Sequence, residues 1–523
     1  MSSNVKLEIE ITEPFARALE LMREGKRHLF ITGKAGTGKS TLLTHFIAED
    51  EAKVVVLAPT GVAALNVKGE TVHSFFRFMP NITLTQAIKK GRSQRDNELY
   101  TELKTLVIDE VSMVRADLMD AVDVFLRAAR GNQQPFGGIQ MILIGDLYQL
   151  PPVVTSEDRE TFGKIYKSPW FFDSQVFIDA AFSMEFVELE KIYRQKNEQF
   201  IALLNAVRNK TISTQHLCAL NERLMKTGDY DDPHAITLTS TNRRAQEING
   251  DRLKALNGRA EHFTAEITGE FETKQFPTES TLSLKPKAQV MFVNNDLMGR
   301  WVNGTLGTVL KVNDSSVLVQ IHEGSAVEVS PHTWDMYRYF YDAGSHSLNQ
   351  EKLGAFTQIP LRLAWAVTIH KSQGKTFDRV IIDIDRGSFA SGQTYVALSR
   401  CRTFEGIFLR RALKASDIRL DFRIQKFLTQ YHYDISEKNM PLKAKIALIE
   451  RAIEDGLELE LLYLKAQDVK SSRRIKPRAV GDMDYEGHSF IGVEAFCLLR
   501  KEWRIFRVDK ILEVKVAESM DRS

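Results

Sequence analysis

HLFITGKAGTGKSTLL, which runs from His28 to Leu43, is the stretch that decides the fold. An apolar run at 28–32 is followed by Gly33 to Ser40, which fits the pattern G-x-x-x-x-G-K-[ST], and then by a helical stretch. A glycine-rich turn in that position lets backbone N–H groups surround a phosphate, and the helix N-terminus adds positive potential. The order strand, turn, helix therefore predicts a nucleotide-binding loop in an α/β domain. The alternative is a glycine-rich turn without a ligand.

The residues of this loop have separate expected roles. Lys39 places a positive charge beside the β- and γ-phosphates, and the hydroxyl of Ser40 is a ligand for Mg²⁺. ATP and Mg²⁺ are therefore the expected nucleotide and cofactor. The residues expected to contact the nucleotide are Gly33, Lys34, Ala35, Gly36, Thr37, Gly38, Lys39, Ser40 and Thr41, together with Gly374 far along the chain.

Polar side chains follow two further apolar runs of the same region. Asp109 and Glu110 end the run at 105–109, and the carboxyl ends of parallel strands are where open α/β sheets bind ligands. We expect Asp109 to hold Mg²⁺ and Glu110 to activate the attacking water. Gln149, after the run at 141–145, is expected to sense the γ-phosphate. Its alternative is a polar turn before the paired prolines that follow.

The apolar runs form two series, which predict two parallel sheets covered by helices. The first series lies at 28–32, 54–58, 105–109 and 141–145, and the second at 186–190, 235–240, 361–368, 380–384 and 406–410. Alternating apolar, glycine and asparagine residues interrupt the second series between about residues 255 and 358 and predict an inserted β-barrel. The expected order is a first domain at 1–182, a second at 183–430 with its insertion at about 285–355, a linker at 431–445 and a last module at 446–518.

Two arginines of the second series are candidates for catalysis. Arg194 lies in ELEKIYRQ and Arg400 in GQTYVALSRCR. If both reach the γ-phosphate from the second domain, they act as arginine fingers across an interdomain cleft. The alternative is that they are ordinary surface arginines in salt bridges.

Composition limits the classes of protein that remain. A chain of 523 residues is too long for one core, and it lacks an apolar run long enough to span a membrane. The start of the chain lacks the features of a secretory signal, so a cytoplasmic location is expected. Three scattered cysteines argue against disulfides and structural zinc. The net charge is only +2, so any nucleic-acid contact must come from local patches.

Eight segments together resemble a known family. GKAGTGKS, APTGVAALNVKGETVHSFF, VIDEVSMV, GDLYQLPPV, YRQ, LTSTNRRAQEIN, WAVTIHKSQGKTFD and TYVALSRCR occur in the order found in superfamily 1B helicases. They are most similar to bacterial Pif1-type helicases, relatives of RecD, over residues 12 to 415. The resemblance implies two RecA-like motor domains and an SH3-like insertion that includes Trp301 to Leu310. It also implies a monomer that moves 5′ to 3′ on single-stranded DNA and unwinds duplex, forked or G-quadruplex DNA.

The resemblance also implies where DNA is contacted. Single-strand binders combine contacts along the phosphates with surfaces for bases, and positions after strand ends suit such contacts. The residues assigned to DNA are Pro59, Thr60, Gly61, His73, Ser74 and Phe75, with a small wedge near 73–80, and Asn242, Thr368, His370, Lys371 and Ser372. Core packing is the alternative for Phe75, Phe76 and Phe78, and a structural role is the alternative for His370. The family's usual adenine-reading glutamine has no counterpart in EITEPFARALELM.

The last module resembles a WYL domain, a small Sm-like β-barrel. Its recognisable positions include Tyr463, and it carries arginines in alternating apolar strands. The residues expected to bind a nucleotide or single-stranded nucleic acid are Tyr463, Arg473, Arg474, Arg504 and Arg507. The alternative is a solvated charged face.

Two other functions remain open at this point. One is a DNA-dependent ATPase that displaces bound proteins without processive unwinding, and the other is a ligand-sensing regulator with a decayed ATPase. RNA also remains open as a track, because no segment recognisably reads a 2′-hydroxyl.

Overall fold

A computed structural model describes residues 11–49, 54–154, 158–226, 234–271, 273–296, 298–322, 324–342, 344, 347–385, 387–388, 390–465, 469–485 and 488–517. The chain divides into two compact units. Unit 1 comprises Met1–Val207 with Ser213–Arg419, and unit 2 comprises Arg208–Ile212 with Leu420–Ser523. No helix in the described ranges is long and apolar enough to cross a membrane.

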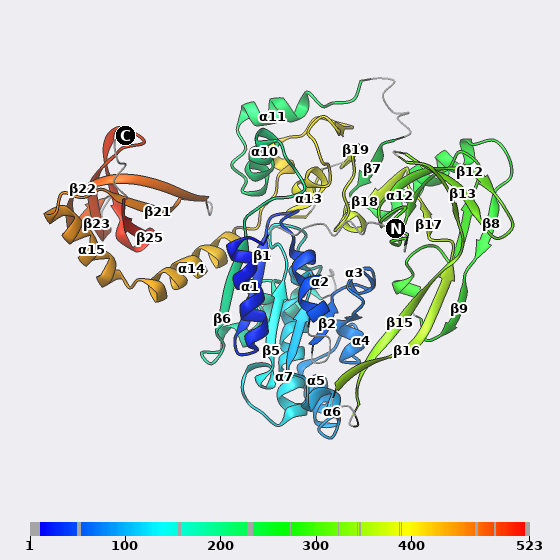
Figure 1. The fold of residues 1–523 in the computed structure, drawn as a ribbon, viewed down its shortest axis with the longest axis horizontal. Coiled ribbons are helices and arrows are strands. Elements are labelled where there is room, and N and C mark those ends of the chain that lie inside the picture. The colour runs from blue at the N-terminus through cyan, green and yellow to red at the C-terminus, as the bar shows by residue number, and fades with distance from the viewer. Residues whose placement is uncertain are drawn as a thin grey trace, which may run out of the picture. The chain divides into compact units, whose positions relative to one another are not determined.

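The first sheet of unit 1 has six parallel strands in the order β3-β2-β4-β5-β1-β6. In chain order they are β1 (His28–Gly33), β2 (Val54–Ala58), β3 (Glu70–Thr71), β4 (Thr105–Ile108), β5 (Gln140–Ile144) and β6 (Met184–Leu189). Strands β2, β4 and β5 are buried at every position, as expected of strands covered on both faces. The longer helices of this region are α1 (Glu13–Glu24), α2 (Lys39–Glu49), α5 (Leu84–Arg92) and α7 (Ala116–Arg130), and Figure 1 draws them in blue to cyan. The first RecA-like motor domain is confirmed.

Strand β6 corrects the expected boundary between the domains. The run at 186–190 was expected to open the second series, but β6 pairs in parallel with β1 along its whole length. The ring of Phe186 lies 5.6 Å from that of Phe30, and Val187 belongs to the core of the first sheet. The apolar run predicted a strand correctly, but it contained no information about which sheet edge the strand joins.

The second sheet has four parallel strands in the order β18-β7-β19-β20. They are β7 (Ile236–Thr239), β18 (Ala366–Thr368), β19 (Val380–Asp383) and β20 (Ile407–Leu409), with helices α10 (Glu198–Arg208), α11 (Thr214–Asn221), α12 (Asn242–Ala255) and α13 (Gln393–Ser399). The run at 361–368 is two strands rather than one. Ala364 N–H donates to Gln289 O (3.0 Å) in the insertion, whereas Trp365 O accepts from Thr237 N–H (2.8 Å) in the second sheet.

The insertion contains an antiparallel sheet in the order β14-β13-β12-β11-β17. Its strands are β11 (Gln289–Phe292), β12 (Leu306–Val312), β13 (Val317–Ile321), β14 (Ala326–Val329) and β17 (Leu361–Leu363), and they enclose a core that includes Val290, Phe292 and Trp301. A long hairpin of β15 (His332–Asp342) and β16 (Ser347–Gln358) extends from this sheet, as the yellow-green strands of Figure 1 show. With β8 (Glu261–Thr264), β9 (Glu266–Gly269) and β10 (Thr281–Leu284), the β-rich region begins at Glu261, within the interruption expected at 255–358 and before the SH3-like part expected from about 285. Its SH3-like character stays a prediction.

Unit 2 differs from expectation at its start. The stretch 431–445, expected to be a linker, lies mostly within α14 (Phe422–Asn439) and α15 (Leu442–Glu454). Polar composition suggested a loop, but Ser436 and Lys445 of these helices are buried and hydrogen-bond to main-chain oxygens of the following sheet. That sheet is antiparallel, in the order β24-β23-β22-β21-β25. Its strands are β21 (Leu459–Lys465), β22 (Val469–Tyr485), β23 (His488–Cys497), β24 (Glu502–Arg507) and β25 (Ile511–Val516).

Candidate nucleotide and nucleic-acid sites

The glycine-rich loop follows β1 and leads into α2, as expected. Gly36 and Gly38 have φ angles of +82° and +88°, which strain any residue with a side chain. A Cβ atom on Gly36 would also lie 2.5 Å from Cβ of Arg194. The Lys39 ammonium, at the first position of α2, donates to Gly33 O (2.7 Å) and Lys34 O (3.0 Å). The Lys39 side chain thus lies over the glycine-rich loop, where it is expected to contact the phosphates.

Asp109 and Glu110 lie directly after β4, where the sequence placed them. The backbone of Glu110 has a φ of +49°, and its N–H donates to the Asp109 carboxylate at 2.9 Å. Burial raises the pKa of Asp109, and Lys39 opposes this shift. Burial and the charge of Asp109 raise the pKa of Glu110 to about 7. A residue other than glycine rarely has its backbone in the left-handed region. A residue that combines this strained backbone with a shifted pKa is a candidate for a functional site.

These oxygen donors fit a magnesium ion. Mg²⁺ prefers hard oxygen ligands and is usually held by one or two carboxylates together with substrate phosphates. Ser40 and Asp109 supply a hydroxyl and a carboxylate. Across the ranges that the structure describes, no group of three or more His, Cys, Asp or Glu side chains could hold a metal by itself. A site completed by nucleotide phosphates is therefore the arrangement that these residues suit.

Gln149 lies in the turn after β5 and is buried. Its amide nitrogen donates to the Asp146 carboxylate at 3.3 Å, and the Gln149 N–H donates to Asp146 O at 3.0 Å. Asp146 is fully buried and interacts electrostatically with Glu110. The structure therefore brings Gln149 to the carboxylates of the site, although its role as a sensor stays a prediction.

Arg194 and Arg400 approach the same site from segments after the first sheet. Arg194 Nη1 donates to Ser399 O at 3.2 Å. Arg400 is 1% exposed, and its Nη1 donates to Ser372 O and Lys375 O at 3.3 Å each. Burial and then Arg194 lower the pKa of Arg400, whereas Glu110 and Asp146 raise it. Both guanidinium groups are thus held by neutral carbonyls, and Arg400 lies within electrostatic reach of Glu110 and Asp146.

Sequence reasoning missed several close approaches of α13 and the residues next to it, to Ala35 and Gln149 of the first motor domain and to Gln195. Ala35 N–H in the loop donates to the Tyr395 hydroxyl at 3.1 Å. Gln195 Nε2 donates to Ser399 O (3.1 Å) and Cys401 O (3.0 Å). A Cβ atom on Gly392, before α13, would lie 2.2 Å from Gln149 O. In a sequence, an apolar helix that contains a tyrosine predicts only that the tyrosine packs in the core. The position of Tyr395 in the TYVALSR segment is the one signal that could have identified it as a contact of the loop.

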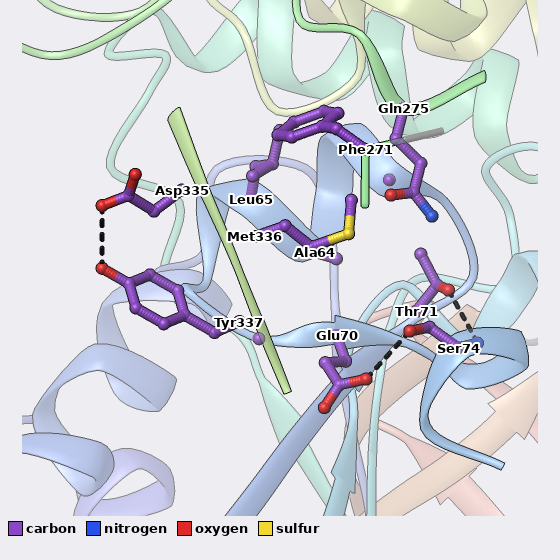
Figure 2. Close-up of a pocket in the computed structure, with 12 residues that line it drawn as sticks. Ala64, Leu65, Glu70, Thr71, Ser74, Phe271, Gln275, Asp335, Met336 and Tyr337 are labelled. Atoms are coloured by element: carbon purple, nitrogen blue, oxygen red, sulfur yellow. Dashed lines mark hydrogen bonds between the residues drawn. The ribbon is translucent and has the colours of Figure 1, made fainter. Parts of the chain in front are cut away.

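The insertion contacts part of the first segment that was expected to bind DNA. The Ser74 hydroxyl donates to Glu70 Oε2 (3.0 Å), and Glu70 Oε1 accepts from Tyr339 N–H (2.7 Å) on the β15–β16 hairpin. Figure 2 shows Glu70, Thr71 and Ser74 on one side of a cavity, with Met336 and Tyr337 of β15 and Gln275 around it. The cavity holds about 30 Å³, enough for a water molecule but not for a nucleotide. Burial raises the pKa of Glu70.

The phenylalanines of the expected wedge are core residues. Phe75, Phe76 and Phe78 are 3%, 1% and 5% exposed. They pack with Tyr100 and Phe125 at centroid distances of 5.1 to 6.2 Å. The expectation that Phe75 offers its ring to DNA is therefore wrong for this structure, because the ring is enclosed by other aromatic rings. Packing was the alternative, and it describes all three residues.

The other expected DNA contacts differ in exposure. Asn242 and Lys371 are exposed, and Pro59, Thr60, Gly61, His73 and His370 are partly exposed. Thr60 caps the short helix α3 (Gly61–Asn66) by accepting from Ala63 N–H at 3.3 Å. The side chains of Thr368 and Ser372 are buried, and Ser372 donates to Ile369 O at 2.7 Å. Of the second segment, Asn242, His370 and Lys371 remain the side chains that could reach a phosphate.

The arginines of unit 2 are mostly paired with carboxylates. Arg474, Arg504 and Arg507 contact Glu458, Glu502 and Asp509 at 2.7, 2.6 and 2.6 Å. Arg473 is partly exposed, and its Nη1 donates to Ser472 O at 2.8 Å. A groove of about 790 Å³ is lined by Tyr463, Phe490, Trp503, Arg504 and Arg507, among others. The groove thus offers aromatic surface together with guanidinium groups that have counterions.

Comparison with known proteins agrees with this geometry. Residues 10–217 match the family model for PIF1-like helicase, and residues 444–516 match the WYL domain. A curated relative, ATP-dependent DNA helicase Pif1 of Bdellovibrio bacteriovorus, is 33% identical over 418 residues, covering 77% of this chain and 88% of the relative. The chain spans 58% to 65% of the length of several animal and fungal curated relatives.

Two solved structures of Bacteroides Pif1 resemble the chain, each at 34% identity over 81% of this chain and 97% of the other. The crystal structure in complex with ADP-AlF4 has a TM-score of 0.72, and the one bound to single-stranded DNA has a TM-score of 0.58. Fold and site define a two-domain motor of the helicase class. The chain belongs to the PIF1-like family of ATP-dependent DNA helicases and carries a WYL domain at its C-terminal end.

Proposed function

We propose that this chain is an ATP-driven motor that moves 5′ to 3′ on single-stranded DNA and unwinds duplex, forked and G-quadruplex DNA. The observation that carries the proposal is the cleft itself. Arg194 lies beside Gly36 of the glycine-rich loop and Arg400 lies within electrostatic reach of Glu110, but both belong to segments that follow the last strand of the first domain. A site completed from both sides allows nucleotide turnover to move one domain against the other.

The chemistry divides among residues of both sides. Lys39 would neutralise phosphate charge, and Ser40 and Asp109 would hold Mg²⁺, which neutralises charge that develops on the phosphates. Glu110 would take the proton of the attacking water, with Gln149 orienting that water. Arg194 and Arg400 would exchange carbonyl partners for the γ-phosphate, which draws the second domain toward the loop. Movement becomes directional only if DNA affinity differs between the closed and open states.

The proposed track rests on the relatives and on exposed side chains. The Bacteroides relative has been crystallised with single-stranded DNA. In this chain Asn242 and Lys371 are exposed, and Pro59, Thr60, Gly61, His73 and His370 are partly exposed. Because Glu70 bonds both Ser74 and Tyr339 of the β15–β16 hairpin, DNA contact at the Ser74 hydroxyl would require the Ser74–Glu70 bond to open. A monomer in the bacterial cytoplasm suits this function.

The proposal is tested by unwinding of partial duplexes that carry either a 5′ or a 3′ single-stranded tail. With ATP and Mg²⁺, strand separation is expected only with the 5′ tail, and Lys39→Ala should remove ATPase and unwinding while ssDNA binding stays. A requirement for a 3′ tail would overturn the direction. ATPase activity and displacement of bound protein without strand separation would favour the alternative of a protein-displacing ATPase.

We also propose the groove of unit 2 as the site of a nucleotide or single-stranded nucleic acid. Trp503 is 52% exposed, and base stacking on an aromatic ring contributes about 1–3 kcal/mol per base. Trp503→Ala in the full chain should therefore weaken binding of a short oligonucleotide. Unchanged affinity would favour a solvated charged face instead.

A further inference from the structure

Lys375 is a buried cation that none of the catalytic roles uses. It follows Gly374 and is only 9% exposed. Its carbonyl oxygen accepts a hydrogen bond from Arg400 Nη1 at 3.3 Å, beside a second acceptor, Ser372 O, at the same distance. The backbone of Lys375 therefore helps to hold one of the guanidinium groups proposed to reach the γ-phosphate.

The side chain of Lys375 points to the insertion. Its ammonium donates to Asn303 Oδ1 in the turn before β12, and its methylene groups pack beside Gly304. Gly304 has a φ of +102°, and a Cβ there would lie 3.4 Å from Cβ of Lys375. Burial and the neighbouring Arg362 lower the pKa of Lys375 to about 7. A desolvated ammonium costs free energy unless it is hydrogen-bonded, so its contact with Asn303 matters to the local structure.

Asn303 continues the connection into the first motor domain. Its Nδ2 donates to Asn66 Oδ1 at 3.3 Å, and its N–H donates to Asn295 Oδ1 at 2.8 Å, which fixes the turn. Asn66 is the last residue of α3, the helix capped by Thr60 in the expected DNA segment. One uninterrupted set of hydrogen bonds thus runs from Arg400 through Lys375 and Asn303 to the end of α3.

We propose that Lys375 is a positioning residue that couples the nucleotide site to helix α3, whose start at Gly61 lies in the segment expected to bind DNA, through Asn303. This inference rests on the proposed motor function. When Arg400 turns toward a nucleotide it leaves the carbonyl of Lys375, and the shifted turn changes the Lys375–Asn303–Asn66 contacts. DNA on α3 acts on the same contacts from the other end. By linkage, each ligand then changes the affinity for the other.

The test measures ATPase activity with and without single-stranded DNA in Lys375→Met, Asn303→Ala and Asn303→Asp. Lys375→Met removes the ammonium, whereas Asn303→Asp keeps the acceptor for Lys375 and loses the donor to Asn66. Lys311→Met, an exposed lysine of β12, is the matched control. A coupling of 1–3 kcal/mol corresponds to about 5- to 150-fold, so stimulation of kcat by DNA should fall at least about fivefold in the three variants. Basal kcat, KM for ATP and DNA affinity without nucleotide should stay within about twofold.

Several outcomes would overturn the inference. The first is DNA stimulation of the ATPase equal to wild type in Lys375→Met and Asn303→Asp. The second is a loss of DNA affinity in Lys375→Met, with a salt dependence of the affinity that is smaller by about one phosphate contact. Lys375 would then bind DNA directly. If Lys375→Met unfolds, the two Asn303 variants decide, because Asn303 is only half-buried. Absence of DNA stimulation in the wild-type chain would instead contradict the proposed motor function.

A double-mutant cycle separates coupling from local damage. If Lys375 and Asn303 act through one contact, Lys375→Met combined with Asn303→Ala should lose no more stimulation than either variant alone. Losses that multiply would mean that the two residues act independently, and that would also contradict the inference.

Discussion

The arginines of the nucleotide cleft and those of unit 2 are held in opposite ways. In the cleft, Arg194 and Arg400 donate to main-chain carbonyls and are largely desolvated. In unit 2, Arg474, Arg504 and Arg507 each contact a carboxylate, and their side chains are 30% to 48% exposed. A guanidinium held by neutral carbonyls keeps its charge for an anion, whereas a paired one must first leave its carboxylate. The number of arginines in a segment therefore says little about its affinity for phosphate.

The largest effect should come from removing a cleft arginine. Arg400→Ala is expected to lower the DNA-stimulated kcat of ATP hydrolysis roughly a thousandfold or more, because an arginine finger contributes about that much. Arg402→Ala is the matched control, since Arg402 is an exposed neighbour paired with Asp378 at 2.8 Å. Steady-state ATPase measurements compare the two variants. If both substitutions lower kcat equally, arginines held by carbonyls and arginines paired with carboxylates do not differ in their contribution to catalysis.

The carboxylates that face these arginines predict a pH dependence. Glu110 must be ionised to accept a proton, and burial with Asp109 raises its pKa to about 7. The kcat/KM for ATP should therefore fall as the pH drops below about 7, approaching tenfold per pH unit, rather than near the ordinary glutamate value of about 4.3. Burial also raises the pKa of the neighbouring Asp109, so Glu110→Gln serves as the control and should lose the acid limb along with about a hundredfold or more in kcat. A wild-type acid limb below pH 5 would contradict the assignment of Glu110 as the base.

The same contrast explains what could be predicted from the sequence. The loop residues, Asp109, Glu110 and Gln149 belong to short segments whose geometry is local, so spacing and strand ends placed them correctly. Phe75 and β6 depended on distant partners, namely Tyr100 and β1, which no local pattern reveals. Tyr395 and Lys375 contact groups far away in the chain and resemble ordinary core or surface residues in a sequence. The C-terminal segment looks basic in the sequence, but ion pairs such as Arg504–Glu502 nearly balance its positive charge in the structure.

A smaller effect is expected from the paired arginines of the groove. The combined substitution Arg504→Ala and Arg507→Ala should leave the ATPase kcat unchanged and weaken oligonucleotide binding less than about fivefold. Two free phosphate contacts on a single strand would lower the salt slope of log affinity by roughly 1.4. Because both arginines pair with Glu502 and Asp509, we expect a smaller decrease in the salt slope. Binding titrations at several salt concentrations measure this slope. A decrease of the full 1.4, roughly, would show that the ion pairs open when the oligonucleotide binds.

The smallest effect concerns stability rather than function. Arg474 and Glu458 are both about one-third exposed and lie 2.7 Å apart. Solvent screening and side-chain entropy limit such a pair to about 0.2–1 kcal/mol, so Arg474→Gln should lower the free energy of unfolding of unit 2 by less than about 1 kcal/mol. Denaturant unfolding of Arg474→Gln, Glu458→Gln and the double variant gives the interaction energy by a double-mutant cycle. An interaction above about 2 kcal/mol would mean that this pair is as constrained as the groups of the cleft, and the contrast between the two sets of arginines would then rest on charge pairing alone.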